Sequence, residues 1–248
     1  MKRRDALVLG GLVLGAVSLP PILRRLPSEF QFEPIAGFEG FRRLQGGAVS
    51  GAGNPFFGLD GRLPDQAPLY ENPIGPPCTA LFGDAPWTSQ KLPVAIFTDF
   101  NCPYCKTLDS RLIALRDSGA PLDIHWHDMP LLGDSSHRAA RAAIAARNFD
   151  REEDARTYLW NHGMRPGQTA LRRMAEHLDL HADVFEREIE SKRVLQSVSK
   201  SLELGMRLGI PGTPGTVLGR TLVIGAIREP DLAKLIKLER SLPPLSCL

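Results

Sequence analysis

The chain has 248 residues, enough for one elaborated domain or two small ones. Hydrophobic residues make up 43% of it and charged residues 23%, which is typical of a globular protein and excludes wholesale disorder and a polytopic membrane protein. The formal net charge is only +2 and the sequence has no long run of Lys or Arg, so we expect no nucleic-acid partner.

The N-terminus has the composition of an export signal. Lys2, Arg3 and Arg4 precede an uncharged, largely apolar stretch over residues 6–23, in which Pro20 and Pro21 would end a helix. Its length lies between that of a cleaved signal peptide and that of a single membrane anchor. We therefore interpret residues 1–25 as one of these two and expect a periplasmic protein with an N-terminus that could tether it to the membrane. A buried N-terminal helix is the less favoured alternative.

Residues 26–75 look like a linker or lead-in. Eight glycines fall between Gly37 and Gly61, with Pro, Asn and Ser among them and no sustained periodicity. The phenylalanines of this segment could pack locally, but nothing assigns them a function: Phe38, Phe41, Phe56 and Phe57.

Stronger patterns begin at Leu92. Apolar and alternating runs predict strands, and apolar residues at helical spacing predict helices. In chain order we expect a strand over 92–100, a helix to about 118, a strand over 122–128, a helical block over 136–208 with breaks at Gly163 and 179–181, a hairpin of 216–218 with 222–224, and a helix over 229–240. This order predicts an α/β domain over residues 76–242, interrupted by an all-helical insertion at about 136–208 and followed by a tail over 243–248.

The chemistry is expected at Cys102 and Cys105. A Cys-X-X-Cys motif placed where a strand leads into a helix puts its first sulfur at the helix N-terminus, where free N–H groups and the helix dipole stabilise a thiolate. Pro103 suits the first helical position because its missing N–H costs nothing there. We therefore interpret Cys102 as the catalytic sulfur that substrates attack and Cys105 as its more buried resolving partner.

A zinc site and an inert buried pair are the alternatives for this motif. A structural zinc needs four ligands, usually as two close pairs, and Cys78 and Cys247 form no second close pair. His125 and His127 could contribute, although alternating strand residues explain them more simply. We expect no metal and no other bound cofactor.

Three segments together resemble a known family. They are residues 97–105 (FTDFNCPYC), the Ala-rich residues 138–146 (RAARAAIAA) and residues 209–214 (GIPGTP). In this order they are similar to the DsbA-type thiol:disulfide oxidoreductases of the thioredoxin superfamily, over roughly residues 75–240. The resemblance implies a thioredoxin-like fold with a helical insertion between its second strand and its last hairpin.

The resemblance also implies roles for single residues. It predicts a cis peptide before Pro214, lying against the cysteine pair, and makes Cys102 the exposed cysteine and Cys105 the buried one. Thr213 and Pro214 match the loop on which substrates dock, and an extended chain could pair there with backbone groups regardless of its sequence. Pro103 and Tyr104, between the cysteines, are expected to contact the substrate as well.

Two positions depart from the family. An acidic residue often lies six positions before the first cysteine, where it assists proton transfer at the buried thiol, but this chain has Ile96 there. The founding member has a histidine between its cysteines, where this chain has Tyr104, which is neutral near pH 7. Both changes still permit dithiol chemistry, and both affect the reduction potential of the cysteine pair.

We expect the reaction to be disulfide donation to unfolded or reduced exported proteins, with reoxidation by a membrane redox partner. A reductase or isomerase on the same fold is one alternative. A tethered holdase chaperone with a merely structural cysteine pair is another. Because an exported protein in an oxidising compartment tends to pair its remaining cysteines, we also expect a structural disulfide between Cys78 and Cys247. Two independent thiols remain the alternative there.

Overall fold

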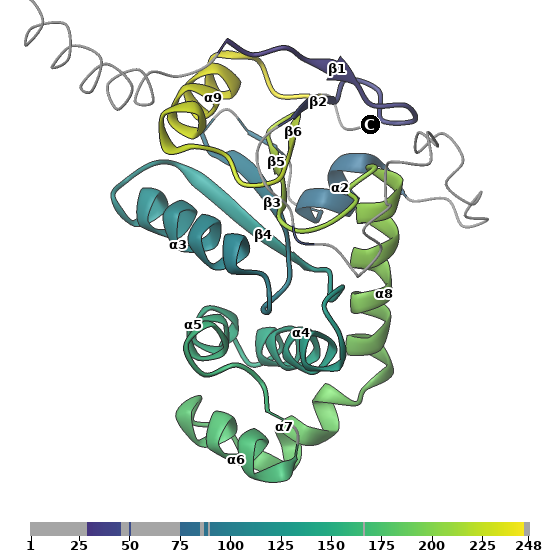
Figure 1. Ribbon diagram of the computed structural model, residues 1–248, viewed down its shortest axis with the longest axis vertical. Helices are drawn as coiled ribbons and strands as arrows, with labels where there is room; N and C mark the ends of the chain where they lie inside the picture. Colours follow the sequence, from purple (N-terminus) through teal and green to yellow (C-terminus); the bar gives the residue numbers. More distant parts are fainter. Residues whose placement is uncertain are drawn as a thin grey trace, which may run out of the picture.

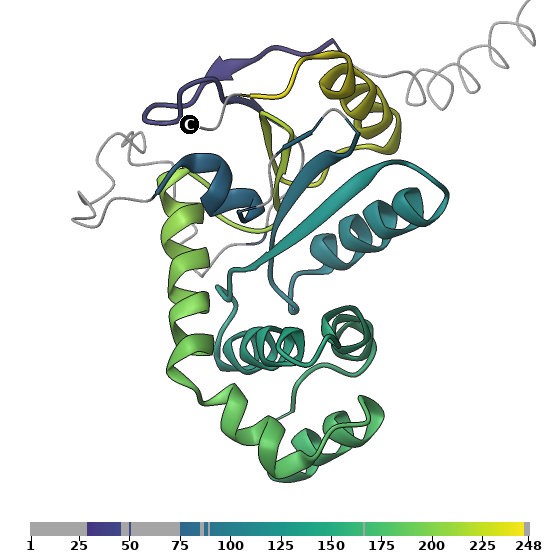
Figure 2. The same ribbon diagram turned by 180° about the vertical axis from the view of Figure 1, so that it is seen from behind.

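The computed structural model describes residues 29–45, 50, 75–84, 87–88, 90–165 and 167–245. A twisted sheet with helices on both faces forms the upper part of the molecule in Figure 1. A group of helices lies below the sheet, and one long helix, α8, runs along the side of the molecule and connects the two parts. Figure 2 shows the same two parts from behind.

The sheet has six strands in the order β1-β2-β6-β5-β3-β4. They are β1 Glu33–Pro34, β2 Arg42–Gln45, β3 Leu92–Thr98, β4 Leu122–Asp128, β5 Gly215–Leu218 and β6 Thr221–Ile224. β3 pairs in parallel with β4 and antiparallel with β5, and β5 pairs antiparallel with β6. Every residue of β3 is buried, as its unbroken apolar run predicts.

The two faces of β3 pack against different helices. Val94 and Ile96 belong to the hydrophobic cluster that includes leucines of α3 (Pro103–Asp117) and α9 (Glu229–Ser241). Ala95 and Phe97 belong to the cluster that includes α2 (Pro77–Phe82) and the C-terminal end of α8 (Lys192–Arg207). This division follows from the period of two in a strand, which sends successive side chains to opposite faces. β3 is therefore held rigidly from both sides, just before the cysteine motif.

The helical insertion contains α4 Asp134–Arg147, α5 Glu152–His162, α6 Gln168–His177, α7 Ala182–Ile189 and most of α8. It has its own hydrophobic core, in which the alanines of α4 allow close packing of α5, α7 and α8. The predicted breaks occur after Gly163, which has a φ of 66°, and at Asp179, which has a φ of 57°. Two further breaks, at residues 148–151 and at 190–191, were not expected. The predicted α/β fold with a helical insertion is confirmed.

The lead-in predicted over 26–75 needs correction where the structure describes it. β2 adds to the sheet in parallel with β6, and β1 pairs antiparallel with β2. Phe38 and Phe41 are buried against the face that α2 covers, whereas Phe56 and Phe57 lie outside the described residues. β2 pairs with the backbone groups at the edge of β6, which would otherwise be unpaired. Because β2 has only four residues in a Gly-rich segment, its sequence shows little strand pattern.

No helix in the described ranges is both long and apolar enough to cross a membrane. The predicted signal peptide or anchor, residues 1–25, lies outside these ranges.

Candidate active site

Cys102 lies at the point where β3 gives way to α3. It is the N-cap of α3, with an extended backbone (φ −86°, ψ 115°), and its sulfur accepts a hydrogen bond from the Cys105 N–H over 3.3 Å. Pro103 takes the first helical position. The predicted placement of Cys102 at a helix N-terminus is therefore confirmed. Both cysteines are free thiols in the structure.

Hydrogen bonds to the sulfur lower the pKa of Cys102 from 9.0 to about 6. The largest contribution comes from the Cys105 thiol, and smaller ones come from the hydroxyl groups of Ser50 and Thr213 and from the Cys105 backbone N–H. All of them favour the thiolate because they stabilise a negative sulfur, whereas burial opposes it. Cys102 is therefore the sulfur of the pair that ionises near neutral pH.

Burial raises the pKa of Cys105 strongly. The neighbouring Cys102 adds to this effect, because the Cys105 thiol donates its proton to the Cys102 sulfur and a second negative charge beside the first is unfavourable. Cys105 is 0% exposed and lies one helical turn inside α3. The two sulfurs thus differ in the way that stepwise thiol–disulfide exchange needs, with one ionised sulfur and one protonated partner.

The loop before β5 brings Thr213 against Cys102. The Thr213–Pro214 peptide is cis, as the resemblance implied, and the Cys102 sulfur lies 3.4 Å from the Thr213 carbonyl oxygen. Both residues of this peptide are buried. The structure therefore brings Thr213 against Cys102 and Cys105, although it lies more than one hundred residues after them in the sequence.

The exposure of Cys102 differs from what the sequence predicts. Cys102 was expected to be the exposed cysteine, but it is only 1% exposed. Its neighbours Pro103 and Tyr104 are exposed, and Tyr104 is 42% exposed. Beside the Cys102 sulfur, Ser50 from the lead-in pairs with Thr213. This contact was not predicted.

Asp99 was also missed, although it immediately follows β3 and organises the turn before Cys102. Its buried carboxylate accepts hydrogen bonds from the backbone N–H groups of Asn101, Leu131 and Leu132 and from the Ser136 hydroxyl, over 2.6 to 2.9 Å. The Asp99 side chain therefore joins the cysteine turn to the loop after β4 and to the first turn of α4. The signal in the sequence is an acidic residue at the end of a fully buried strand.

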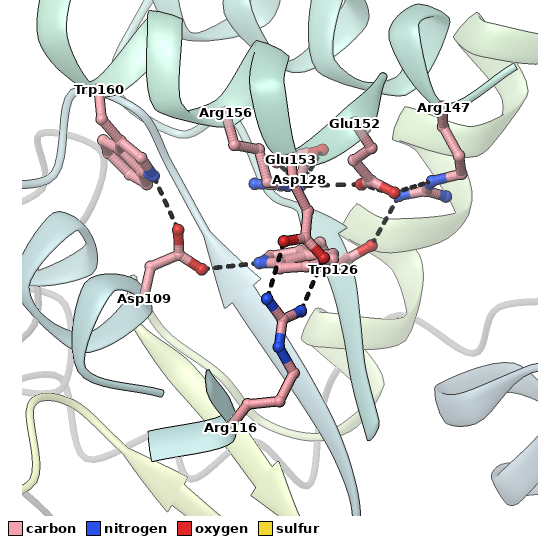
Figure 3. Close-up of polar contacts among 9 residues, drawn as sticks. All are labelled: Asp109, Arg116, Trp126, Asp128, Arg147, Glu152, Glu153, Arg156 and Trp160. Carbon is pink, nitrogen blue, oxygen red and sulfur yellow. Dashed lines mark hydrogen bonds and ion pairs between the residues drawn. The ribbon is translucent and has the colours of Figure 1, made fainter. Parts of the chain in front are cut away.

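A second buried carboxylate, Asp109, lies on α3 one turn after Cys105. Its two oxygens accept hydrogen bonds from the indole N–H groups of Trp126 on β4, over 2.7 Å, and Trp160 on α5, over 2.8 Å. Figure 3 shows Asp109 between these two tryptophans. Asp109 therefore fixes the cysteine helix to both the sheet and the insertion.

Ion pairs extend this contact between the sheet and the insertion (Figure 3). Arg156 of α5 is 1% exposed and bonds to both oxygens of Asp128 at the end of β4, each over 2.8 Å. Glu152 pairs with Arg147 over 2.7 Å and also faces Arg156 over 3.4 Å. Arg116 of α3 reaches across to Glu153. The insertion is thus held against α3 and β4 by charged groups, several of them shielded from water.

Two of the remaining candidate ligands for a metal, His127 and Cys78, have other partners. His127 stacks on Phe97, and its Nε2–H donates to the Leu81 carbonyl over 2.9 Å, while burial lowers its pKa to about 4. Cys78 is disulfide-bonded, and Cys247 lies outside the described residues. In the part of the chain that the structure describes, His, Cys, Asp and Glu side chains form no cluster of three that could hold a metal ion.

Residues 93–237 match the family described as the DSBA-like thioredoxin domain. The chain belongs to this family. The match begins in β3 and ends in α9, so it includes both cysteines, the whole insertion and the loop with the cis peptide, but neither β1 nor β2. Proteins of the DSBA-like family are thiol:disulfide oxidoreductases, and the chain is therefore an enzyme of this kind.

Solved structures agree with membership of the DSBA-like family. A thioredoxin-like oxidoreductase from Silicibacter pomeroyi is 29% identical, with a TM-score of 0.56 over 66% of this chain and 98% of that one. ScsC from Proteus mirabilis is 25% identical, with a TM-score of 0.55 over 66% of this chain and 76% of that one. The thiol-disulfide exchange protein alpha-DsbA2 from Wolbachia pipientis, at 23% identity, shares the fold, with a TM-score of 0.54 over 59% of this chain and 81% of that one. No curated protein sequence matches the chain.

Proposed function

We propose that Cys102 and Cys105 form the redox pair of a disulfide donor that acts on exported proteins in the periplasm. The observation that carries the proposal is the contrast between the two thiols. Hydrogen bonds lower the pKa of Cys102 to about 6, whereas burial raises the pKa of Cys105. One sulfur is thereby suited to leave as a thiolate and the other to hold a proton.

The reaction has two exchange steps. A substrate thiolate attacks the Cys102 sulfur of the oxidised pair, the Cys102–Cys105 bond breaks, and Cys105 leaves and takes up a proton. A second substrate thiolate then attacks the substrate sulfur of this mixed disulfide, and Cys102 leaves as a thiolate. The substrate loses two electrons and gains a disulfide, while the enzyme gains two electrons as its dithiol.

The low pKa of Cys102 favours donation over reduction. At pH 7, a pKa of about 6 in place of 9.0 stabilises the reduced form by about 1.4 kcal/mol. For a two-electron couple this corresponds to about 30 mV, which makes the pair a stronger oxidant. The same stabilisation makes Cys102 the better leaving group in the second step.

The substrate docks beside Cys102. The Thr213 N–H and carbonyl oxygen pair with Ser50 in this structure, and the same two groups can pair with any extended chain that takes its place. Pro214 fixes the bend of this loop, and the exposed Pro103 and Tyr104 border the same place on the cysteine helix. Recognition through backbone groups suits an enzyme that accepts many unfolded exported proteins.

The enzyme works outside the cytoplasm and passes its electrons to a membrane redox partner. The basic and apolar residues 1–25 support export or anchoring. We further propose a structural disulfide between Cys78 and Cys247. Cys78 is disulfide-bonded while Cys102 and Cys105 are free, and Leu245 packs partly buried against the hydrophobic cluster that contains Cys78.

Substrate trapping tests the proposal. Oxidised wild-type protein should introduce disulfides into a reduced, unfolded test protein, and Cys102→Ala should abolish this transfer. Cys105→Ala, expressed in the periplasm, should accumulate reductant-sensitive adducts on Cys102 because the resolving thiol is absent.

Each alternative function predicts a different result. A Cys105→Ala protein that runs as a clean monomer without reductant would contradict the exchange mechanism. A wild-type pair found reduced in freshly isolated periplasm would favour a reductase or isomerase. Suppression of aggregation that survives in Cys102→Ala, with no adducts in Cys105→Ala, would favour a holdase.

A further inference from the structure

Ser50 pairs with Thr213 as one strand residue pairs with another. The Ser50 N–H donates to the Thr213 carbonyl oxygen over 2.7 Å, and the Thr213 N–H donates to the Ser50 carbonyl oxygen over 2.7 Å. This exchange of two bonds is that of a hydrogen-bonded pair between antiparallel strands. The Thr213 hydroxyl also lies 3.5 Å from the Ser50 carbonyl oxygen. Ser50 thus uses both of the backbone groups of Thr213 on which we propose that substrates dock.

The side chain of Ser50 faces the redox pair. Its hydroxyl is among the groups that lower the pKa of Cys102, which places it beside the Cys102 sulfur. Serine and cysteine differ only in the atom beyond Cβ, so a cysteine in this position would present its sulfur to the Cys102 sulfur. Ser50 therefore has the backbone pairing and the side-chain direction of an attacking substrate cysteine, with an oxygen that cannot form a disulfide.

The contact closes the site. Cys102 is 1% exposed and Thr213 is 0% exposed, although Tyr104, two residues after Cys102, is 42% exposed. A polypeptide cannot reach the Cys102 sulfur or the Thr213 backbone while Ser50 occupies both. The bridge must therefore open before a substrate binds.

Ser50 is also held near this place by the chain. It follows β2 by only a few residues. β2 pairs with β6, and β6 pairs with β5, the strand that begins directly after Pro214. A segment tethered so closely has a high effective concentration at the docking edge, and so competes with an external substrate.

We propose that Ser50 is an intramolecular pseudosubstrate, which occupies the docking edge at Thr213 and caps Cys102 until a cysteine-containing extended segment displaces it. This inference rests on the proposed function, because it assigns regulation to the same site. Substrates that pair well with the Thr213 backbone open the site, whereas those that cannot replace the Ser50 bonds react slowly.

Covalent trapping tests the position of Ser50 without requiring turnover. In a Cys105→Ala background, Ser50→Cys is treated with oxidised glutathione. Glutathione first becomes attached to Cys102, and the thiolate introduced at position 50 then attacks the Cys102 sulfur, releases reduced glutathione and forms an intramolecular disulfide. Ser199→Cys in the same background is the matched control, because Ser199 is exposed on α8.

Peptide mapping without reductant gives the result. We expect a disulfide between position 50 and Cys102 in most Ser50→Cys chains, and glutathione retained on Cys102 in the Ser199→Cys control. If glutathione stays on Cys102 to the same extent in both variants, Ser50 does not lie at Cys102 and the inference is wrong.

Opening the bridge tests the regulation. Ser50→Pro removes the N–H that donates to Thr213, while Ser50→Ala keeps both backbone bonds. In the reduced protein, the rate at which a bulky maleimide alkylates Cys102 should rise about tenfold in Ser50→Pro, because the loss of about one backbone hydrogen bond favours the open site by about that factor. The rate should rise much less in Ser50→Ala. Disulfide transfer from the oxidised protein to a reduced polypeptide should rise with it.

The two proposals fail in different ways. If alkylation rises in Ser50→Pro but neither it nor the wild type transfers disulfides, the pseudosubstrate contact stands and the proposed function fails. If both transfer disulfides and alkylate at equal rates, the proposed function stands and the regulation by Ser50 is refuted.

Discussion

The Cys102 thiol should titrate near pH 6 in the reduced protein. With a pKa of about 6 it is about 90% ionised at pH 7, whereas a thiol with the ordinary pKa of 9.0 is only about 1% ionised. Because the Cys105 thiol makes the largest contribution, Cys105→Ala should raise the pKa of Cys102 toward 9.0. Cys105→Ser retains a donor and should raise it less.

The same shift makes the stability of the reduced protein depend on pH. A lowered pKa stabilises the folded state fully above pH 9.0, the unfolded value, and this stabilisation is lost as pH falls through about 6. It amounts to about 1.4 kcal/mol at pH 7 and to almost nothing at pH 5. Cys105 acts in the opposite direction only near and above pH 9, where the unfolded chain ionises it and the folded chain does not.

Two assays measure the titration. Thiolate absorbance at 240 nm and the rate of iodoacetamide alkylation are followed against pH, with Cys102→Ser as the baseline. Urea unfolding at pH 5 and pH 7 then compares the reduced wild type with Cys102→Ser, and the difference in free energy of unfolding should grow by about 1 kcal/mol. A midpoint at pH 8.5 or above, unchanged in Cys105→Ala, would show that these hydrogen bonds do not stabilise the thiolate.

Three further predictions concern stability. Arg156→Met should lower the free energy of unfolding by about 3–5 kcal/mol in urea, because Asp128 would remain buried without its partner, and pairing it with Asp128→Leu should restore most of the loss. Gly205→Ala should lower the free energy of unfolding by about 1–3 kcal/mol, measured by thermal unfolding, because a Cβ there would lie 2.7 Å from the sulfur of a buried methionine. If an alanine at an exposed serine of the same helix lowers it equally, this reason is wrong. Cys78→Ser should cost about 2–5 kcal/mol and free Cys247 for alkylation, and an unchanged melting temperature would argue against a structural disulfide.

Much of the fold follows from local patterns. The apolar run of β3, the Cys-X-X-Cys motif at its end and the hairpin of 216–218 with 222–224 each produce a signal within about ten residues, and all three elements form as expected. The helix N-terminus then positions Cys102 through backbone geometry alone. For this reason the location of the redox pair could be predicted without knowledge of tertiary contacts.

The missed features depend on contacts between distant residues. β2 is four residues long and is stabilised by β6, which lies far along the chain, so its own sequence carries little pattern. The contact of Ser50 with Thr213, beside the buried Cys102, is equally non-local. Asp128 and Arg156 read as ordinary charges in the sequence, and only folding brings them together in a buried pair.

The reduction potential of the Cys102–Cys105 couple tests the proposal of a disulfide donor most directly. The protein is equilibrated with glutathione buffers of known ratio, quenched with acid, and its free thiols are counted by mass spectrometry after alkylation. The stabilised Cys102 thiolate predicts a potential of about −240 mV or less negative, at least about 30 mV more oxidising than the cytosolic reductant thioredoxin at about −270 mV. A value at or below about −270 mV would contradict disulfide donation and identify the pair as a reductant.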